Sequence, residues 1–378
     1  MKITEIRTYL MSAATGKDSW SRRNWLFVKV LTDEGIYGVG EASGWPRVVE
    51  TAVRDLSAIL IGDDPFRIER ICQKIMTAMM GHGMTGVVGS GAMTGIEMAL
   101  WDLKGKALGV PVYELFGGRI RDEVQLYAHA GTTERNEELV SMGYGALKTG
   151  GTDGLPAKVA GLRDALGPDV DLMVDVHGPP WLTTRDAIAL GQRLEEDDLL
   201  FYEDPVAPEN IEGIRRVAES VNIPIAVGER HSYLWGVRQL LEEEIADVIQ
   251  PDTGRAGGLL QLKKIAALAE AHYALIAPHD GSLGPVAEMG AAHVLATVPN
   301  FLLLEHLADD VPARYEVMEP QPRIVDGSIV LSDAPGLGVD IVEDAIAKYP
   351  STGNVSALAE EDDHLYVAPR RRRARFLQ

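Results

Sequence analysis

The 378-residue chain has little cysteine and few aromatic side chains: Cys72 stands alone, and Phe, Trp and Tyr together make up 6% of the residues. A single cysteine excludes an intramolecular disulfide and fits a reducing compartment. The sequence also lacks an apolar run long enough to span a bilayer, and its first residues, MKITEIRTYLMSAATGK, have no apolar core of the kind found in signal peptides. We therefore expect a cytoplasmic protein with no membrane partner.

Positive charge is scarce as well. The chain has 36 Lys and Arg residues against 56 Asp and Glu residues, a formal net charge of -20. This balance argues against nucleic acid as a partner. The C-terminus is the exception, with Arg370, Arg371, Arg372, Arg373 and Arg375. These arginines could bind an anion or a partner, but a solvated, partly disordered tail over residues 351–378 is the favoured interpretation.

The first third of the chain has a mixed pattern. A length of 378 residues suits a barrel plus an accessory domain. Residues 1–123 contain two alternating segments, KITEIRTYL and NWLFVKVLTD, and a turn at Asp33–Gly35 leads into a third, IYGVGEAS. Helical spacing follows in RVVETAVRDLSAIL and in AMTGIEMALWDLKGKAL, which stops at Gly109. We expect an α+β capping domain here.

Residues 124–307 show a different, repeating pattern. Short apolar runs recur every 20 to 30 residues, as LYAHA, ALKTG, LMVDVHG, LLFYEDP, IPIAVGE, ADVIQPD, ALIAPHD and FLLLEHL, with amphipathic helical stretches between them. Strands that alternate with helices imply parallel pairing, and eight strands with seven connections imply a closed barrel. The predicted fold is therefore α/β, a modified TIM barrel of the (β/α)7β type. Residues 308–350 carry a hairpin signal, RIVDGSIVLSDAPG, and a short helix, and are expected to return to the capping domain.

Polar residues gather where a barrel would use them. Seven of the eight predicted strands end in polar or charged residues: Lys148, Asp175 with His177, Glu203, Glu229, Asp252, His279 and Glu305. The carboxyl ends of barrel strands converge on one mouth, where active sites lie. A lone strand-end carboxylate is more often a helix cap or part of an ion pair, but capping does not explain seven strands in succession.

Three of these residues suggest a metal site. Asp175, Glu203 and Glu229 lie 28 and 26 residues apart, each one βα unit from the next. Carboxylates at close range repel each other unless a cation joins them, and an oxygen-only set suits a hard divalent ion such as Mg²⁺. An acidic rim without metal is the alternative.

Asp252 and His279 suggest a general base. They lie 27 residues apart on the sixth and seventh strands. A carboxylate held against one imidazole nitrogen fixes the tautomer and raises the basicity of the other nitrogen. A structural histidine is the competing interpretation of His279, and the partner on the preceding strand makes it less favoured.

Together these residues resemble the enolase superfamily, and within it the mandelate racemase subgroup. The resemblance rests on DEGIYGVGEAS, SGAMTGIEMALWDLKGKALGVPVYELFGG, VDVHG, YEDP, VGER, IQPD, APHD and the glutamate in LLLEHL, in order over nearly the whole chain. It implies that Asp175, Glu203 and Glu229 are Mg²⁺ ligands and that His279 and Asp252 form the catalytic dyad. It further implies substrate contacts for Glu305, Arg230 and Lys148. Homo-oligomers are common in this family, so we expect one.

Two details refine the expected chemistry. Many subgroup members end the second strand in Lys-x-Lys, but here Gly150 stands at the second position, which leaves one face of the substrate without an obvious base and weakens the case for a racemase. His177 follows the aspartate in VDVHG by two residues, as in galactonate dehydratase and related acid-sugar dehydratases, where this histidine protonates the departing 3-hydroxyl. A supporting role for His177 beside the metal ligands is the alternative.

The expected reaction is Mg²⁺-dependent dehydration of a (2R)-configured acid sugar to a 2-keto-3-deoxy acid. His279 would remove the proton at C2, and His177 would protonate the 3-hydroxyl as it leaves. The loops of the capping domain should hold the rest of the sugar, with Arg22, Arg23 and His82 as candidate contacts. A racemase, epimerase or cycloisomerase of an α-hydroxy acid on the same scaffold is one alternative, and a non-catalytic ligand-binding relative is another.

Overall fold

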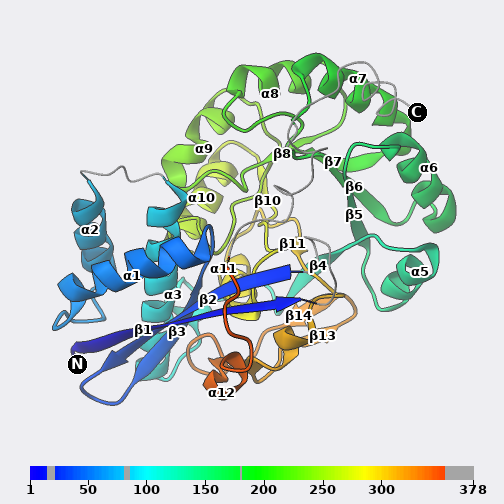
Figure 1. Ribbon diagram of the computed structural model, residues 1–378. Coiled ribbons are helices and arrows are strands. Elements are labelled where there is room, and N and C mark those ends of the chain that lie inside the picture. The colour runs from blue at the N-terminus through cyan, green and yellow to red at the C-terminus, as the bar shows by residue number, and fades with distance from the viewer. Residues whose placement is uncertain (15–21, 81–85, 179–180, 354–378) are drawn as a thin grey trace.

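The computed structural model describes residues 1–14, 22–80, 86–178 and 181–353. It has two parts, an N-terminal domain at the lower left of Figure 1 and a barrel at the right. His82 and the arginines of the C-terminal tail lie outside the described residues. In the part of the chain that is described, no helix is long and apolar enough to cross a membrane.

The N-terminal domain is built on an antiparallel sheet of three strands, β1 (Ile3–Ala14), β2 (Arg22–Thr32) and β3 (Tyr37–Ala42). The predicted turn joins β2 to β3, and Gly35 adopts there a φ of 77° that glycine reaches without strain. Helices α1 (Pro46–Leu60) and α3 (Val87–Leu108) pack on the sheet and follow the prediction. Helix α2 (Ile68–Met79) was not predicted, although its buried isoleucines have helical spacing.

Helix α3 lies directly on β3 because glycines remove the side chains that would separate them. A Cβ atom at Gly38 would lie 2.0 Å from the carbonyl oxygen of Ala99, and one at Gly40 would lie 2.4 Å from that of Gly95. The helix ends at Gly109, whose φ is 69°, as the sequence predicts. Most of α3 is buried, so it forms the contact layer between the sheet and the barrel.

The barrel has the eight predicted parallel strands. They are β4 (Glu123–His129), β5 (Ala146–Gly150), β6 (Asp171–Asp175), β7 (Leu199–Glu203), β8 (Ile225–Val227), β9 (Val248–Ile249), β10 (Leu275–Ile276) and β11 (Leu304–Glu305). Consecutive strands from β4 to β10 pair in sequence order, β10 meets the chain before β11 through an Ile276–Phe301 bridge, and β11 pairs with β4. The sheet is therefore closed.

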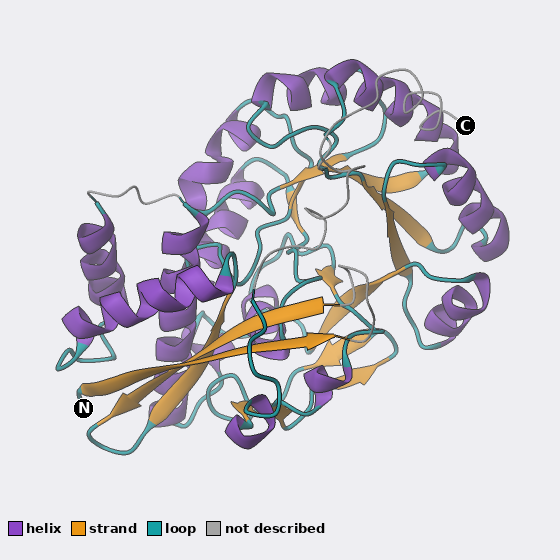
Figure 2. Cartoon of the chain, in the orientation of Figure 1, coloured by secondary structure: helices purple, strands orange, loops and turns teal. Residues whose placement is uncertain are grey.

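Helices cover the outside of the barrel, as the purple ribbons in Figure 2 show. After the short α4 (Val112–Leu115), they are α5 (Thr133–Ser141), α6 (Leu155–Leu166), α7 (Thr184–Leu194), α8 (Ile211–Ala218), α9 (Tyr233–Glu242), α10 (Leu259–Ala271) and α11 (Pro285–Leu295). The inside is filled by one residue from each strand or its end: Tyr127, Ala146, Met173, Phe201, Ala226, Val248, Ala277 and Leu303. The barrel is thus a packed core with its polar residues above this layer.

The C-terminal segment contacts both parts of the molecule. The predicted hairpin forms from β13 (Arg323–Val325) and β14 (Ser328–Val330), and β14 pairs antiparallel with the barrel strand β4. Two further short strands, β12 (Met318–Glu319) and β15 (Asp340–Ile341), pair with each other. Helix α12 (Glu343–Ile346) then leads to a bridge between Pro350 and Met11 of β1.

Two buried glutamates of the N-terminal domain cap helices of the barrel. Glu41 accepts hydrogen bonds from the N–H groups of Gly284 and Ala287 at the start of α11. Glu97 accepts them from Leu259 and Leu260 at the start of α10, and from the indole of Trp101. Burial raises the pKa of each carboxyl to about 7, although the N–H donors at the helix ends oppose this shift.

Candidate active site

Six polar side chains stand two residues beyond apolar residues that fill the barrel. The polar residues, each with the apolar residue that it follows, are His129 (after Tyr127), Lys148 (after Ala146), Asp175 (after Met173), Glu203 (after Phe201), His279 (after Ala277) and Glu305 (after Leu303). Side chains two residues apart along a strand point to the same face. The polar set therefore forms the next layer, at the mouth of the barrel.

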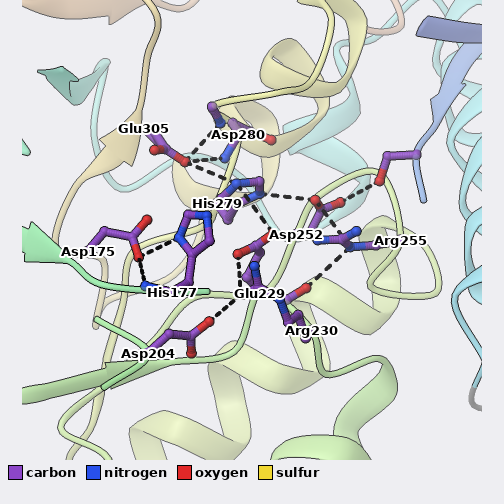
Figure 3. Close-up of polar contacts among 12 residues, drawn as sticks. Asp175, His177, Asp204, Glu229, Arg230, Asp252, Arg255, His279, Asp280 and Glu305 are labelled. Atoms are coloured by element: carbon purple, nitrogen blue, oxygen red, sulfur yellow. Dashed lines mark hydrogen bonds and ion pairs between the residues drawn. The ribbon is translucent and has the colours of Figure 1, made fainter. Parts of the chain in front are cut away.

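Glu229 and Asp252 reach this layer by a different spacing. Gly228 stands two residues after Ala226 with a φ of 146°, and a Cβ atom there would lie 2.6 Å from the backbone nitrogen of Gln250. The acidic side chain therefore follows one residue later, at Glu229. On the next strand Asp252 forms a parallel bridge with His279 of the neighbouring segment. Figure 3 shows the resulting group of carboxylates, imidazoles and guanidinium groups.

The three predicted metal ligands each lie beside a cationic side chain. Asp175 and Glu203 are register partners on β6 and β7. The Nζ atom of Lys148 lies 2.9 Å from Oε2 of Glu203 and 3.9 Å from Oδ2 of Asp175. Glu229 lies 2.8 Å from the guanidinium of Arg255. Among the described residues, no group of three or more His, Cys, Asp or Glu side chains is arranged so that it could hold a metal ion.

The donor chemistry nevertheless fits a hard divalent cation. All three side chains offer carboxylate oxygens, and Oε1 of Glu203 is buried without a hydrogen-bond partner among the described residues. Burial and the neighbouring charge of Asp175 raise the pKa of Glu203 to about 8, even though Lys148 lowers it. An added positive charge would relieve both the repulsion and the missing contact.

The predicted dyad is formed. The Nδ1 atom of His279 lies 3.0 Å from Oδ2 of Asp252, which leaves Nε2 to face the site. That nitrogen lies 3.8 Å from Oε1 of Glu229 and 3.8 Å from Oε2 of Glu305. Burial disfavours a protonated ring, but Glu229, Glu305 and Asp252 outweigh it and raise the pKa of His279 to about 10.

His177 is held by the aspartate that precedes it. Its Nδ1 atom lies 2.6 Å from Oδ1 of Asp175, and its backbone N–H donates to the same oxygen. Burial lowers the pKa of His177, but the contact with Asp175 prevails and raises it, and the charge of Glu229 adds to the rise. The contact with Asp175 therefore stabilises the protonated form of His177.

Glu305 connects the two sides of the mouth. Its Oε1 atom lies 2.7 Å from Nζ of Lys148 and 2.8 Å from Nε2 of His129, and its Oε2 atom accepts N–H bonds from Asp280 and Gly281. Burial opposes ionisation of Glu305, but the charges of Lys148 and His279 and the hydrogen bond with His129 hold its pKa well below the usual range. The sequence pattern assigns no polar end to the first barrel strand; in the structure β4 ends at His129, one residue before the predicted end.

Two arginines, Arg230 and Arg255, also lie at the site, and the sequence predicts only Arg230. Arg230 contacts Asp204, lies 2.7 Å from Oε2 of Glu229, and stacks on Trp181 at 5.2 Å. Arg255 was not predicted; its Nε atom lies 3.3 Å from Oδ2 of Asp252, in addition to its contact with Glu229. It follows Asp252 by three residues, on a loop whose path the sequence pattern does not specify.

A cavity of about 170 Å³ lies between the two parts of the molecule, beside Ser43 and Arg255, which both contact Asp252. Its lining includes Arg22, Arg23, Asn24, Ser43, Arg255 and Ser282. The Nε atom of Arg23 lies 2.7 Å from Oδ1 of Asp310. The side chain of Arg22 is exposed at the start of β2, and no ion pair or hydrogen bond joins it to another described residue. Of the three predicted contacts in the N-terminal domain, the structure thus brings Arg22 and Arg23 to this cavity.

Comparison with protein families agrees with this geometry. Residues 3–117 match the mandelate racemase/muconate lactonizing enzyme N-terminal domain, and residues 131–345 match the enolase C-terminal domain-like family. The chain belongs to the mandelate racemase/muconate lactonizing enzyme family. Its fold is the barrel of that family, with the N-terminal capping domain that accompanies it.

Three relatives within the family are named as enzymes of a sugar acid or have a sugar acid bound. D-galactonate dehydratase of Variovorax paradoxus is 37% identical over 372 residues, which cover 92% of this chain and 94% of that one. The 3,6-anhydro-D-galactonate cycloisomerase of Zobellia galactanivorans has a TM-score of 0.86 at 30% identity, over 93% of this chain and all of the other. An enolase from Pantoea ananatis with bound D-gluconate and Mg has a TM-score of 0.84 at 30% identity, over 94% and 96%.

Proposed function

We propose that the protein dehydrates a (2R)-configured acid sugar, an aldonate or a related acid, to a 2-keto-3-deoxy acid. The observation that carries this proposal is the pair of histidines held by aspartates at one barrel mouth: His279 by Asp252, and His177 by Asp175. Glu229 lies near enough to affect the pKa of both rings. Dehydration needs one group to take a proton from C2 and another to give a proton at the 3-hydroxyl, and two imidazoles meet that need.

The roles of the two rings follow from their contacts. Asp252 accepts the Nδ1–H of His279, so Nε2 is the nitrogen that removes the C2 proton. His177, whose protonated form Asp175 stabilises, gives its proton to the 3-hydroxyl, and the C3–O bond breaks to release water. The enol that remains tautomerises to the 2-keto-3-deoxy acid. Protons gained and lost by the two rings balance over the reaction.

Asp175, Glu203 and Glu229 would hold Mg²⁺ in this proposal, in line with the Mg in the Pantoea ananatis structure. When bound, the ion would supply positive charge that stabilises the negative charge developing on the substrate carboxylate as the C2 proton leaves. Cation binding at Glu229 would also neutralise the carboxylate that most strongly raises the pKa of His279, and so would favour the neutral ring that a base requires.

Lys148, Glu305 and Arg230 are the proposed contacts for the substrate near its carboxylate. The ammonium of Lys148 is buried and is the nearest cationic group to both Glu203 and Glu305. It can donate to an enediolate oxygen as negative charge develops there. We place the remainder of the sugar in the cavity that Arg22 and Arg23 border.

A racemase is less well supported because one face of the substrate lacks a base. Gly150 ends β5 beside Asp175, and a Cβ atom there would lie 3.0 Å from the carbonyl oxygen of Asp175. Cycloisomerisation remains the second candidate, since a structural relative is a cycloisomerase of an anhydro acid sugar. The two reactions differ in mass balance, because dehydration releases water and cycloisomerisation does not.

A screen of acid sugars with Mg²⁺ tests the proposal. We expect 2-keto acid from at least one 2R aldonate or aldarate, with a mass lower than the substrate by one water, and no product with His279→Asn. A product of unchanged mass would favour the cycloisomerase. Absence of any 2-keto acid from a complete set of aldonates and aldarates would contradict the proposed function.

A further inference from the structure

Ser43 joins the N-terminal domain to the acidic member of the dyad. Its Oγ atom donates to Oδ1 of Asp252 at 2.7 Å, across 209 residues of sequence. The same oxygen accepts the N–H of Gly254 at 3.0 Å, while Oδ2 faces His279 and Arg255. Among the described residues, Ser43 therefore provides the one side-chain donor to Oδ1 of this buried carboxylate, and it comes from outside the barrel.

The backbone around Ser43 is fixed to the same barrel loop. Its N–H donates to the carbonyl oxygen of Gly254 at 2.8 Å. A Cβ atom at Gly254 would lie 2.7 Å from the Cβ of Ser43, so the absence of a side chain there permits the close approach. Two residues earlier, Glu41 caps α11. The contacts of the Ser43 backbone and of Glu41 thus hold the hydroxyl in place.

We propose that Ser43 is a positioning residue of the dyad, an inference that rests on the proposed function. A carboxylate that accepts defined hydrogen bonds on both oxygens cannot rotate freely about its Cβ–Cγ bond. The donor at Oδ1 therefore keeps Oδ2 in line with Nδ1 of His279 and keeps Nε2 directed at C2 of the substrate. Removal of C2–H then depends on correct docking of the two parts of the molecule.

Ser43→Ala tests the proposal, with Ser90→Ala as the matched control. Ser90 is also a buried serine of the N-terminal domain, and it accepts a 3.0 Å hydrogen bond from Ser232 of the barrel without contacting the dyad. We expect Ser43→Ala to lower kcat by about 10- to 100-fold, the range for a hydrogen bond to a charged group, with little change in KM. C2 hydrogen exchange should slow equally, and Ser90→Ala should change neither rate.

A second measurement does not depend on turnover or on the identity of the sugar. The proton on Nδ1 of His279 should give a low-field NMR resonance because it is hydrogen-bonded to Asp252. We expect this resonance to move in Ser43→Ala and to stay in place in Ser90→Ala. Ser43→Cys, which keeps a weaker donor of similar size, should give an intermediate kcat and an intermediate shift.

The outcomes separate this inference from the proposed function. If the wild-type enzyme dehydrates no acid sugar, the function is wrong, and the resonance still tests the role of Ser43. An unmoved resonance and an unchanged kcat in Ser43→Ala would overturn the positioning role. Equal losses in Ser43→Ala and Ser90→Ala would also overturn it, because they would show a general effect of docking the two parts.

Discussion

Nδ1 of His279 lies 3.0 Å from Oδ2 of Asp252, and the two residues form a parallel bridge between neighbouring barrel segments. The bridge joins the two backbones just beyond the ends of β9 and β10 and so helps to place the two side chains. The Nδ1 atom of the ring thus contacts Asp252, and Nε2 faces Glu229 and Glu305 at the barrel mouth. The roles of the two histidines can therefore be separated by mutation.

His279→Asn should abolish both dehydration and exchange of the C2 hydrogen with solvent deuterium, because both need the base. His177→Asn should slow dehydration by about 10²–10⁴-fold, the usual contribution of a general acid, while C2 exchange continues. Proton NMR in D₂O and a 2-keto acid assay measure the two rates on the same samples.

Near-normal dehydration by His177→Asn would refute its role as the acid. Loss of exchange in both variants would favour a concerted reaction or a different base. His272→Asn is a suitable control, because this histidine follows α10, outside the group of residues at the barrel mouth.

Chelation should abolish activity, and Mg²⁺ should restore it. Glu229→Gln should be inactive and should bind Mg²⁺ more weakly in a calorimetric titration, because an amide oxygen carries no net charge. Glu219→Gln, which neutralises an exposed glutamate after α8, should behave like the wild type. Full activity after exhaustive chelation would contradict the metal site.

The substrate should have the 2R configuration. In the proposed reaction His279 is the base at C2, and Gly150 at the end of β5 has no side chain that could act as a base on the opposite face. Kinetics with pairs of acid sugars that differ only at C2 will measure this preference. Comparable turnover of both epimers would mean that a second base acts at the site.

Arg22→Gln should raise KM for the preferred acid sugar by about tenfold and leave kcat nearly unchanged, because Arg22 borders the cavity and does not contact the dyad. Arg47→Gln is the control, since Arg47 is an exposed arginine on α1 that does not line the cavity. Equal KM values for the wild type and Arg22→Gln would exclude Arg22 as a substrate contact.

Glu97 should make the stability of the protein depend on pH. Its pKa is about 7 in the folded chain, against a reference value of 4.5, so the folded state binds more protons between these values. The free energy of unfolding of the wild type should therefore fall as pH rises from about 4.5 to 7, by on the order of 2–3 kcal/mol from this group.

Glu97→Gln cannot titrate, so its stability relative to the wild type should improve over the same interval. Chemical denaturation at several pH values measures the difference. Glu41 has a similar pKa and remains in the variant, so part of the slope should persist. A constant difference between wild type and variant would contradict the assignment.

The eight barrel strands and most of the site could be predicted from the sequence because two regularities act together. Apolar runs repeat at one βα unit, and the polar residue that matters lies two positions beyond the residue that fills the barrel. Lys148, Asp175, Glu203, His279 and Glu305 all obey this spacing. His129 obeys it too, but a one-residue error in the end of β4 hid it from the sequence pattern.

The contacts that the sequence did not predict join segments that are distant in the chain. No local sequence pattern specifies how such segments lie relative to one another. Ser43 reaches Asp252 only because β3 docks on the loop after β9. Arg255 turns back to Glu229 from a loop, and its direction depends on that loop's path. Local periodicity specifies which face of a strand a side chain occupies, but it does not specify which distant segment will face it.

The caps that Glu41 and Glu97 provide restrict how the enzyme can exchange substrate for product. If the N-terminal domain swung away as a rigid body, the first N–H groups of α10 and α11 would lose their acceptors, and two buried carboxylates would lose their donors together. The two caps should therefore keep the N-terminal domain docked on the barrel while substrate enters and product leaves.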